Sequence, residues 1–361
     1  MPESPVAVAA SSPLKLRRFA AYRGVRVLAW EGDILYGCRG YEVVALPVSD
    51  GAVWYRVARF RPVWWRNLTS RAALSSRLVR DGFHALAILG DQTNDQTMVG
   101  VVPGALVRRT HGSDEFEVTH QVLRGTRPLH VTVVPSGNIY WGEYFDNRER
   151  SEVHIYGSTD RGCTWQIAYT FPVASIRHVH NIVYDRWGDC LWILTGDEGA
   201  ECKILRASCD LRSIEVVLAG NQQARAVSAI PTHDGLYFST DTPSEENHVY
   251  RLDRGGSIER VGDLSSSSIY ACKVGEAMFF STMIEPSSVN KTREVQIAGS
   301  TEGTNWHVLA GWQKDSLPPR YFQYGNAIFP DGVNATRYLA ATTIAVERDD
   351  LVTTLWEVES V

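Results

Sequence analysis

Short runs of alternating apolar and polar residues recur along the chain and are separated by polar or glycine-containing breaks. The runs are rich in Val, Ile, Tyr and Trp, which are the residues enriched in β-strands. The pattern is clearest in residues 129–144, 179–197, 226–241 and 337–347. Glycine-containing turn signals interrupt the first three of these stretches, as expected for antiparallel hairpins. The pattern therefore predicts an all-β protein.

One turn between two apolar runs is unusually elaborate and has the sequence GSTDRGCTW at residues 157–165. Asp160 can accept hydrogen bonds from backbone N–H groups of the turn, and Gly162 can adopt a positive φ. Trp165 can leave the turn and pack against the sheet. Weaker copies of the turn recur at a period of roughly 45 residues, around Asp50, Asp114, Asp210, Asp253 and Glu302.

These turns resemble the Asp box, S-x-D-x-G-x-T-W, of the sialidase-like β-propellers, whose units are also called BNR repeats. Residues 158–165 match the box fully, and residues 300–306 match it nearly so. The resemblance implies that each box joins the third and fourth strands of a blade, on the face away from the active site. The box would then be scaffolding, and we expect Trp165 and Trp306 to pack between strands of their own blades.

Four strands in each repeat of roughly 45 residues predict a β-propeller. We count seven blades, with six as the alternative, near residues 24–60, 78–124, 128–172, 178–218, 225–262, 267–311 and 322–361. Residues 14–361 would form one domain behind a flexible tail of residues 1–13, and residues 14–19 can close the ring. Residues 61–78 combine a Trp pair with a helix-like run, and we expect them to form an insertion between the first two blades.

The face opposite the boxes should gather the starts of the inner strands and the hairpins between second and third strands. The chain has only 10 histidines, yet four of them stand at the starts of three successive inner strands, namely His84, His130, His178 and His180. Acidic residues directly after the second strands should stay close to the channel. We therefore predict a catalytic group on this face that consists of His130, His178, His180, Glu143, Asp197, Asp241 and Arg225.

Two imidazoles flanked by carboxylates suit general acid–base catalysis or a divalent metal. Because alternate residues of a strand point to the same side, the H-x-H motif of His178 and His180 can chelate. For Mn²⁺, Zn²⁺ or Ca²⁺ we predict His130 and His180 as ligands. Candidate substrate-binding residues are Tyr144, Arg148, Glu198, Tyr270, Tyr324, Trp64 and Trp65. The alternative roles are strand capping for each histidine and core packing for each aromatic residue.

Composition excludes several other functions. The formal net charge is −5 and the 36 Lys and Arg residues are spread along the chain, so we expect no nucleic-acid partner. No apolar run is long enough for a signal peptide or a membrane span, and we expect a cytoplasmic protein. The six cysteines form no CxxC pair, which predicts free thiols. The sequence indicates no oligomeric state.

The resemblance implies a carbohydrate-active enzyme acting on an oligosaccharide or polysaccharide, such as an intermediate of exopolysaccharide assembly. Sialidases carry an F/Y-R-I-P motif near the N-terminus, whereas Phe60, Arg61 and Pro62 lack the isoleucine and follow the first blade. A histidine-centred site is more similar to the propeller polysaccharide lyases, in which His or Tyr removes the proton α to a uronate carboxylate. A glycoside hydrolase is the alternative enzyme, and a non-catalytic glycan- or protein-binding propeller is the alternative from another class.

Overall fold

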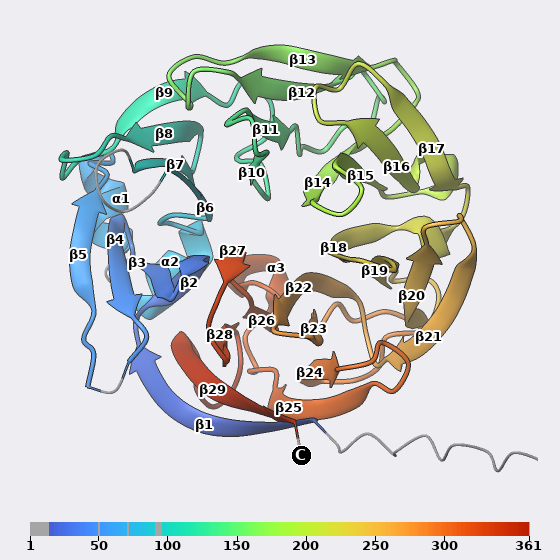
Figure 1. The fold of residues 1–361 in the computed structure, drawn as a ribbon. Coiled ribbons are helices and arrows are strands. Elements are labelled where there is room, and N and C mark those ends of the chain that lie inside the picture. Colours follow the sequence, from blue (N-terminus) through green and yellow to red (C-terminus); the bar gives the residue numbers. More distant parts are fainter. Residues whose placement is uncertain (1–13, 50, 71, 91–95, 361) are drawn as a thin grey trace, which may run out of the picture.

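Seven sheets surround a central channel in the computed structural model (Figure 1). The structure describes residues 14–49, 51–70, 72–90 and 96–360. The sheets confirm the prediction of an all-β, seven-bladed β-propeller. The tail predicted for residues 1–13 and the turn copy at Asp50 lie outside the described residues.

The first four blades follow one another along the chain, each running from an inner to an outer strand. Their strands are β2 (Arg26–Gly32), β3 (Ile34–Arg39), β4 (Glu42–Pro47) and β5 (Tyr55–Arg59); β6 (Ala85–Leu89), β7 (Thr97–Val102), β8 (Ala105–Arg109) and β9 (Glu117–Gln121); β10 (Thr132–Val133), β11 (Ile139–Gly142), β12 (Val153–Ser158) and β13 (Gln166–Phe171); and β14 (His178–Asp185), β15 (Cys190–Gly196), β16 (Lys203–Ser208) and β17 (Ile214–Ala219). A fifth strand, β27 (Asp331–Asn334), pairs in parallel with β2.

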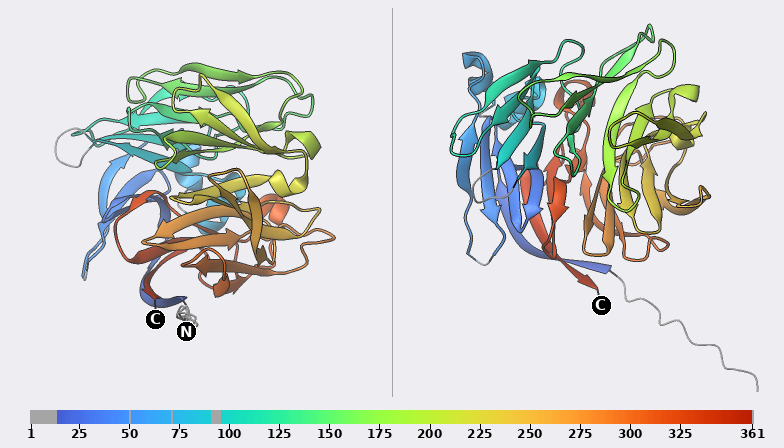
Figure 2. Two further views of the ribbon diagram at one scale, coloured as in Figure 1. Left: turned by 45° about the vertical axis from the view of Figure 1, so that its right-hand side comes forward. Right: turned by 45° about the horizontal axis from the view of Figure 1, so that its top comes forward.

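The last three blades complete the ring. Their strands are β18 (Ala226–Thr232), β19 (Gly235–Thr240), β20 (Asn247–Asp253) and β21 (Ile258–Leu264); β22 (Ser268–Val274), β23 (Ala277–Thr282), β24 (Glu294–Ser300) and β25 (His307–Gln313); and β26 (Asn326–Ile328), β28 (Tyr338–Ile344), β29 (Val352–Ser360) and β1 (Leu14–Arg23). The N-terminal strand β1 pairs antiparallel with the C-terminal strand β29, as Figure 2 shows. This pairing joins the two ends of the described chain and closes the ring.

The channel has two chemically different ends. At one end, which we call the histidine end, His178 at the start of β14 pairs with Gly196 at the end of β15. At the other end, Asp185 pairs with Cys190 around the turn between the same two strands. The turn at residues 158–165 that resembles the Asp box begins at this second end, because Ser158 pairs with Ile139 directly after the first turn of its blade. We call it the box end.

Two helices lie between the first and second blades, α1 (Trp64–Thr69) and α2 (Ala73–Val79). Arg77 of α2 is buried and its guanidinium donates to the carbonyl oxygen of Phe322, 2.7 Å away, in the short helix α3 (Pro319–Phe322). It also forms ion pairs with Asp315 at 2.7 Å and Asp350 at 3.2 Å. The helices are therefore anchored to the last blade, on the side where β26 begins.

Apolar side chains fill the spaces between neighbouring blades. Second strands such as β7, β19 and β23 are buried at every position. For example, Val99 and Val101 of β7 pack with Ile139 and Trp141 of the next blade. Burial of this apolar surface holds the blades together and leaves the inner strands to line the channel.

The turn at residues 158–165 forms a closed hydrogen-bond network. Asp160 accepts hydrogen bonds from the Thr164 amide at 2.9 Å, the Thr164 hydroxyl at 2.6 Å and the Ser158 hydroxyl at 2.8 Å. Gly162 has φ of +81° and donates its N–H to the Ser158 hydroxyl at 2.8 Å. Burial alone would raise the pKa of Asp160, but the hydrogen bonds lower it to about 2. The ionised carboxylate is thus part of the turn.

Each of the two box tryptophans packs at a boundary between two blades. Trp165 donates its indole N–H to Thr119 of β9 at 3.2 Å, so it contacts the preceding blade as well as Trp141 of its own. Trp306 lies 5.2 Å from Phe280 of its own blade and against Gly262 of the preceding one. The expectation that they pack within their own blades is therefore incomplete. A blade is only one sheet thick, so a large side chain that leaves its edge meets the adjacent blade.

We expect Asp160→Ala to lower the free energy of unfolding by about 1 to 3 kcal/mol, because it leaves turn donors without their acceptor. Denaturant titration measures this loss. Any activity per folded molecule should be unchanged. A loss of function without a loss of stability would show that the turn is more than scaffolding.

Candidate functional site

The two histidines of the H-x-H motif stand at an irregularity in β14. Val179 pairs with Thr195 and Asn181 pairs with Leu194, so His180 is the extra residue of a β-bulge. A bulge re-aims the side chain of its extra residue. The imidazole of His180 lies over Gly196, where an added Cβ would overlap the ring. The bulge and the glycine together bring the ring of His180 next to that of His178.

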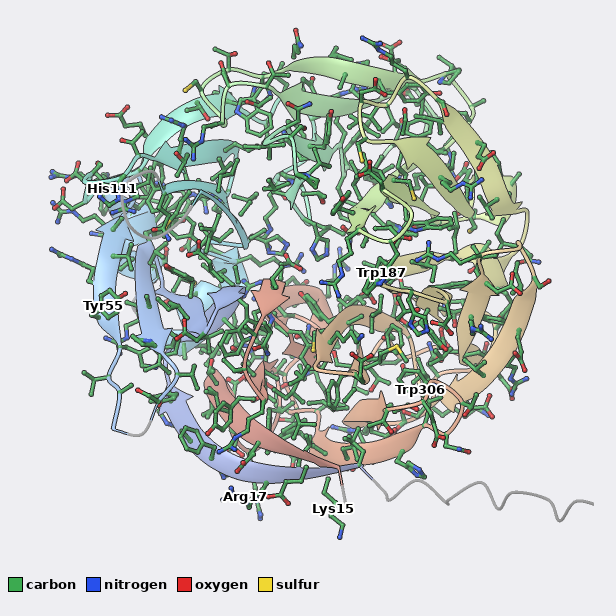
Figure 3. All side chains as sticks on the ribbon, viewed as in Figure 1. Lys15, Arg17, Tyr55, His111, Trp187 and Trp306 are labelled. Carbon is green, nitrogen blue, oxygen red and sulfur yellow. The ribbon has the colours of Figure 1, made fainter. Side chains whose placement is uncertain are left out.

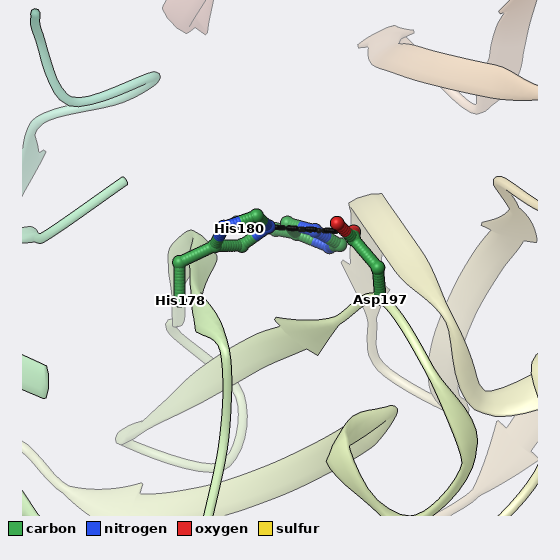
Figure 4. Close-up of side chains that lie close together, drawn as sticks. All are labelled: His178, His180 and Asp197. Atoms are coloured by element: carbon green, nitrogen blue, oxygen red, sulfur yellow. Dashed lines mark hydrogen bonds and ion pairs between the residues drawn. The ribbon is translucent and has the colours of Figure 1, made fainter. Parts of the chain in front are cut away.

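His178, His180 and Asp197 form a compact cluster at the histidine end (Figure 4). The two Nε2 atoms are 3.1 Å apart. Oδ1 of Asp197 lies 3.3 Å from Nε2 of His178 and 3.1 Å from Nε2 of His180. Both histidines are buried, with 4% and 3% of their surface exposed. Three nitrogen and oxygen ligand atoms therefore converge on one point.

Backbone carbonyl groups fix the tautomers of both imidazoles. Nδ1 of His178 donates to the carbonyl oxygen of Phe145 at 3.0 Å, and Nδ1 of His180 donates to that of Ala226 at 2.8 Å. Because each Nδ1 carries the proton, each neutral ring presents an Nε2 lone pair to the other ring and to Asp197. Burial is the main factor that lowers the pKa of His180, so a second proton on this ring is disfavoured.

Three facing lone pairs repel one another unless a cation lies between them. Ligands placed about 2.0–2.2 Å from a metal are about 2.8–3.6 Å from one another in octahedral and tetrahedral sites. The three separations, 3.1, 3.1 and 3.3 Å, fall in this range. Histidine ligands that donate Nδ1–H to a carbonyl group are typical of metal sites. The residues present therefore fit a divalent metal, and two nitrogen ligands favour Zn²⁺ or Mn²⁺ over Ca²⁺.

Two arginines surround Asp197. Arg225 lies with Nη2 3.4 Å from Asp197 and 3.3 Å from Asp241, so it bridges the two carboxylates. Arg177 lies 3.2 Å from Asp197 and 2.6 Å from Asp146. The two guanidinium groups favour the charged form of the Asp197 carboxyl group. Asp197 therefore offers an ionised carboxylate to the cluster.

Asp241 has the opposite electrostatic character. It is buried, and this burial is the largest factor that raises the pKa of its carboxyl group to about 7. Arg225 opposes the increase, whereas Glu285 and Asp197 add to it. A carboxyl group with this pKa can exchange a proton near neutral pH, which is the property of a general acid or base.

Tyr144 is the predicted substrate-binding residue that lies closest to the two histidines. Its ring centroid is 4.3 Å from that of His178 and 6.2 Å from that of His180. Burial and the charges of Asp197 and Asp241 raise the pKa of its hydroxyl group to about 12. The phenol is therefore protonated at neutral pH and can donate its proton. The side chain of Tyr144 is also partly exposed to solvent.

Two residues of the predicted catalytic group are engaged elsewhere. Glu143 is buried and accepts a hydrogen bond from Arg124 at 2.8 Å and one from the His154 amide at 2.8 Å, so its carboxylate holds its own blade together. His130 contacts Asp331 through Nδ1 at 3.2 Å, inside the channel. Among the described residues, His178, His180 and Asp197 form a group that could hold a metal ion, and His130 of the predicted ligand pair lies outside this group.

The other predicted substrate-binding residues are dispersed. Arg148 and Glu198 are exposed and form ion pairs with Asp146 and Arg150. Tyr270 lines the channel, and burial raises the pKa of Tyr324, which lies near Glu285. Trp64 and Trp65 are on α1 with 79% and 40% of their surface exposed.

Sequence reasoning missed three residues around the cluster. Arg177 directly precedes the H-x-H motif, and a charged residue just before an inner strand could have indicated it. Glu285, whose charge acts on Asp241, lies in the connection between β23 and β24, and polar residues of such loops are usually only solvated. Gly196 ends its strand before Asp197, and nothing in the sequence shows that an imidazole lies over it.

Described residues form two cavities in the channel. One, about 660 Å³, extends from His130 and Tyr270 to inner-hairpin turn residues such as Trp187 and Gly275 at the box end. The smaller one, about 40 Å³, is lined by His84, His130, Tyr270 and Asp331 among apolar residues. Neither lining includes His178, His180 or Asp197, which we call the metal-fitting cluster. Asp197 and the neighbouring Tyr144 are partly exposed, so solvent contacts the cluster at these residues.

Comparisons with known proteins support the fold but show no family relationship. No protein-family model matches the sequence, and no curated protein matches it. A chain of the "Crystal Structure of Mitotic Checkpoint Complex" is similar with a TM-score of 0.55 and 11% identity, over 98% of this chain and 96% of that one. The WD40 β-propeller domain of Doa1 is similar with a TM-score of 0.53 and 11% identity, over 96% of this chain and 97% of that one. Among the described residues, no helix has the length and apolar character needed to cross a membrane. These similarities concern the fold alone, and they agree with the β-propeller that the seven sheets form.

Proposed function

We propose that the protein is a carbohydrate-active enzyme that cleaves a uronate-containing oligosaccharide or polysaccharide at the histidine end. The observation that carries the proposal is the convergence of two Nε2 lone pairs and one carboxylate oxygen beside Arg225, Asp241 and Tyr144. The resemblance of residues 158–165 to the Asp box supports it, because that resemblance implies an active site on the opposite face.

A divalent metal bound by His178, His180 and Asp197 would supply Lewis-acid stabilisation of a negatively charged transition state. Arg225 would neutralise the uronate carboxylate, which makes the proton on the adjacent carbon more acidic. Ionised Asp241 would accept that proton. The bond to the leaving oxygen would break as the carbon–carbon double bond forms, and the Tyr144 hydroxyl would donate a proton to that oxygen.

A panel of uronate-containing polysaccharides, with Mn²⁺ or Zn²⁺ added, tests this proposal. Cleavage by elimination produces an unsaturated sugar that absorbs in the ultraviolet, whereas hydrolysis produces reducing ends without this absorbance. We expect elimination, and we expect Asp241→Asn to slow it roughly a hundredfold or more because it removes the proton acceptor.

Asp33→Asn makes the same change at an exposed aspartate in the turn between β2 and β3, and this matched control should retain the activity. Reducing ends alone would assign the site to a glycoside hydrolase. Saturable glycan binding without any cleavage would instead contradict the enzyme and favour a binding platform, a use of the propeller fold that needs no shifted pKa.

A further inference from the structure

A second group of nitrogen-bearing side chains lies at the starts of the inner strands of the first three blades. Arg26 begins β2, His84 directly precedes β6, and Arg127 and His130 precede β10. Arg80 follows the last turn of α2. Figure 3 shows side-chain nitrogen atoms gathered around the central opening. These five residues, which we call the basic cluster, are not used by the proposed function.

The members of the basic cluster lie close to one another and have few acidic partners. Nη2 of Arg26 lies 3.3 Å from Nδ1 of His84. Arg127 donates to the backbone carbonyl oxygen of Arg80 at 2.8 Å. His130 contacts Asp331, the one acidic residue with a contact to the cluster in the described part of the chain.

The arginines lack the partners that buried guanidinium groups normally have. Within the described ranges, Arg26, Arg80 and Arg127 form no ion pair with a carboxylate. Nε of Arg26 is buried and has no hydrogen-bond partner there. Arg26 and Arg127 are half-buried and Arg80 is exposed. Partly buried cationic groups without an anion are costly, so this arrangement favours an added negative charge.

The electrostatic effects among these groups agree with that interpretation. Burial, followed by the charges of Arg26 and Arg80, lowers the pKa of Arg127 to about 10. Burial and the charges of Arg127 and Arg26 also hold the pKa of His84 well below its ordinary value. Tyr41 and Tyr270 act in the opposite direction on Arg127. The cations therefore repel one another in this structure.

The smaller cavity offers space for an anion beside the basic cluster. His84, His130, Tyr270 and Asp331 are part of its wall, together with apolar residues from the inner strands. The three arginines are not part of the wall, and Arg26 adjoins it through its contact with His84. Its volume is about 40 Å³, and a cavity needs roughly 10–15 Å³ on this measure for one water molecule. It can thus hold about three waters, which is close to the size of one tetrahedral oxyanion.

We infer that the basic cluster binds a tetrahedral dianion, either inorganic phosphate or the phosphate group of a monoester. Three guanidinium groups opposed by a single nearby carboxylate leave a charge surplus that a monoanion does not balance. A tetrahedral group with several acceptor oxygens also matches donors that approach from three blades. This site is separate from the metal-fitting cluster and does not depend on the proposed function.

Isothermal titration of the full chain at constant ionic strength tests the inference with inorganic phosphate and glycerol phosphate as probes. We expect saturable binding of at least one probe by the wild-type protein. Arg127→Gln and Arg26→Gln should each weaken that binding at least tenfold. Arg212→Gln is the matched control, because Arg212 is exposed and paired with Asp210 in a turn at the box end, and it should bind like the wild type.

Tighter binding of glycerol phosphate would assign the site to a phosphate ester, and tighter binding of inorganic phosphate would assign it to the free ion. His84→Asn gives a second set of data if either arginine variant fails to fold, as judged by its melting temperature. The inference is overturned if neither probe binds the wild-type protein, or if the folded cluster variants bind with wild-type affinity.

Discussion

Replacing His180 with alanine is expected to abolish divalent-metal binding and to lower turnover at least a hundredfold. The substitution removes one of two nitrogen ligands and the contact at 3.1 Å that this ring makes with Asp197. Two ligands would then be left, which is too few for a tight protein site. Metal binding is measured by titration with Zn²⁺ or Mn²⁺, and turnover on the polysaccharide that the panel identifies.

His233→Ala is the control for this experiment, because His233 is exposed and lies in the turn between β18 and β19. It should bind metal with wild-type affinity. The same metal affinity in His180→Ala and in the wild-type protein would show that the cluster is not a metal centre. A melting temperature close to that of the wild type would confirm that the lost function is local.

Gly196→Ala is expected to have an effect as large as the loss of the imidazole itself, although Gly196 carries no functional group. Its added Cβ would overlap Cε1 of His180, so the ring must leave its position beside His178. Metal affinity should fall at least a hundredfold, because ligand geometry is lost. The measurement is the same metal titration, together with thermal unfolding.

Gly100→Ala provides a matched steric control in another blade. Its added Cβ would overlap the ring of Phe83 in the core, far in sequence from the cluster. We expect a lower melting temperature with unchanged metal affinity. If Gly196→Ala instead bound metal normally, the position of His180 over this glycine would not be required for the site.

The architecture could be predicted because it repeats. Alternation of apolar and polar residues defines the strands, and turns such as that around Asp160 mark the period, so errors in one repeat are corrected by the others. The boundary packing of Trp165 was not accessible in this way. It depends on how neighbouring blades face each other, which a pattern within one blade does not contain.

The candidate site could be predicted only in part. Strand starts identified His178 and His180, and the end of the next strand identified Asp197. The sequence did not indicate that Glu143 pairs with Arg124, because this arginine comes from the connection to the preceding blade. His130 has the same position in its blade as the other histidines, but β27 brings Asp331 to it from the far end of the chain. Such long-range contacts leave no local signal.

The most direct test of the metal-fitting cluster is anomalous diffraction from crystals of the full chain grown with Zn²⁺ or Mn²⁺. The account predicts an anomalous peak about 2.0–2.2 Å from Nε2 of His178, Nε2 of His180 and Oδ1 of Asp197. Under the same conditions, crystals of His180→Ala should lack this peak. An ordered site without any peak at a saturating metal concentration, or a peak only at other residues, would contradict the account.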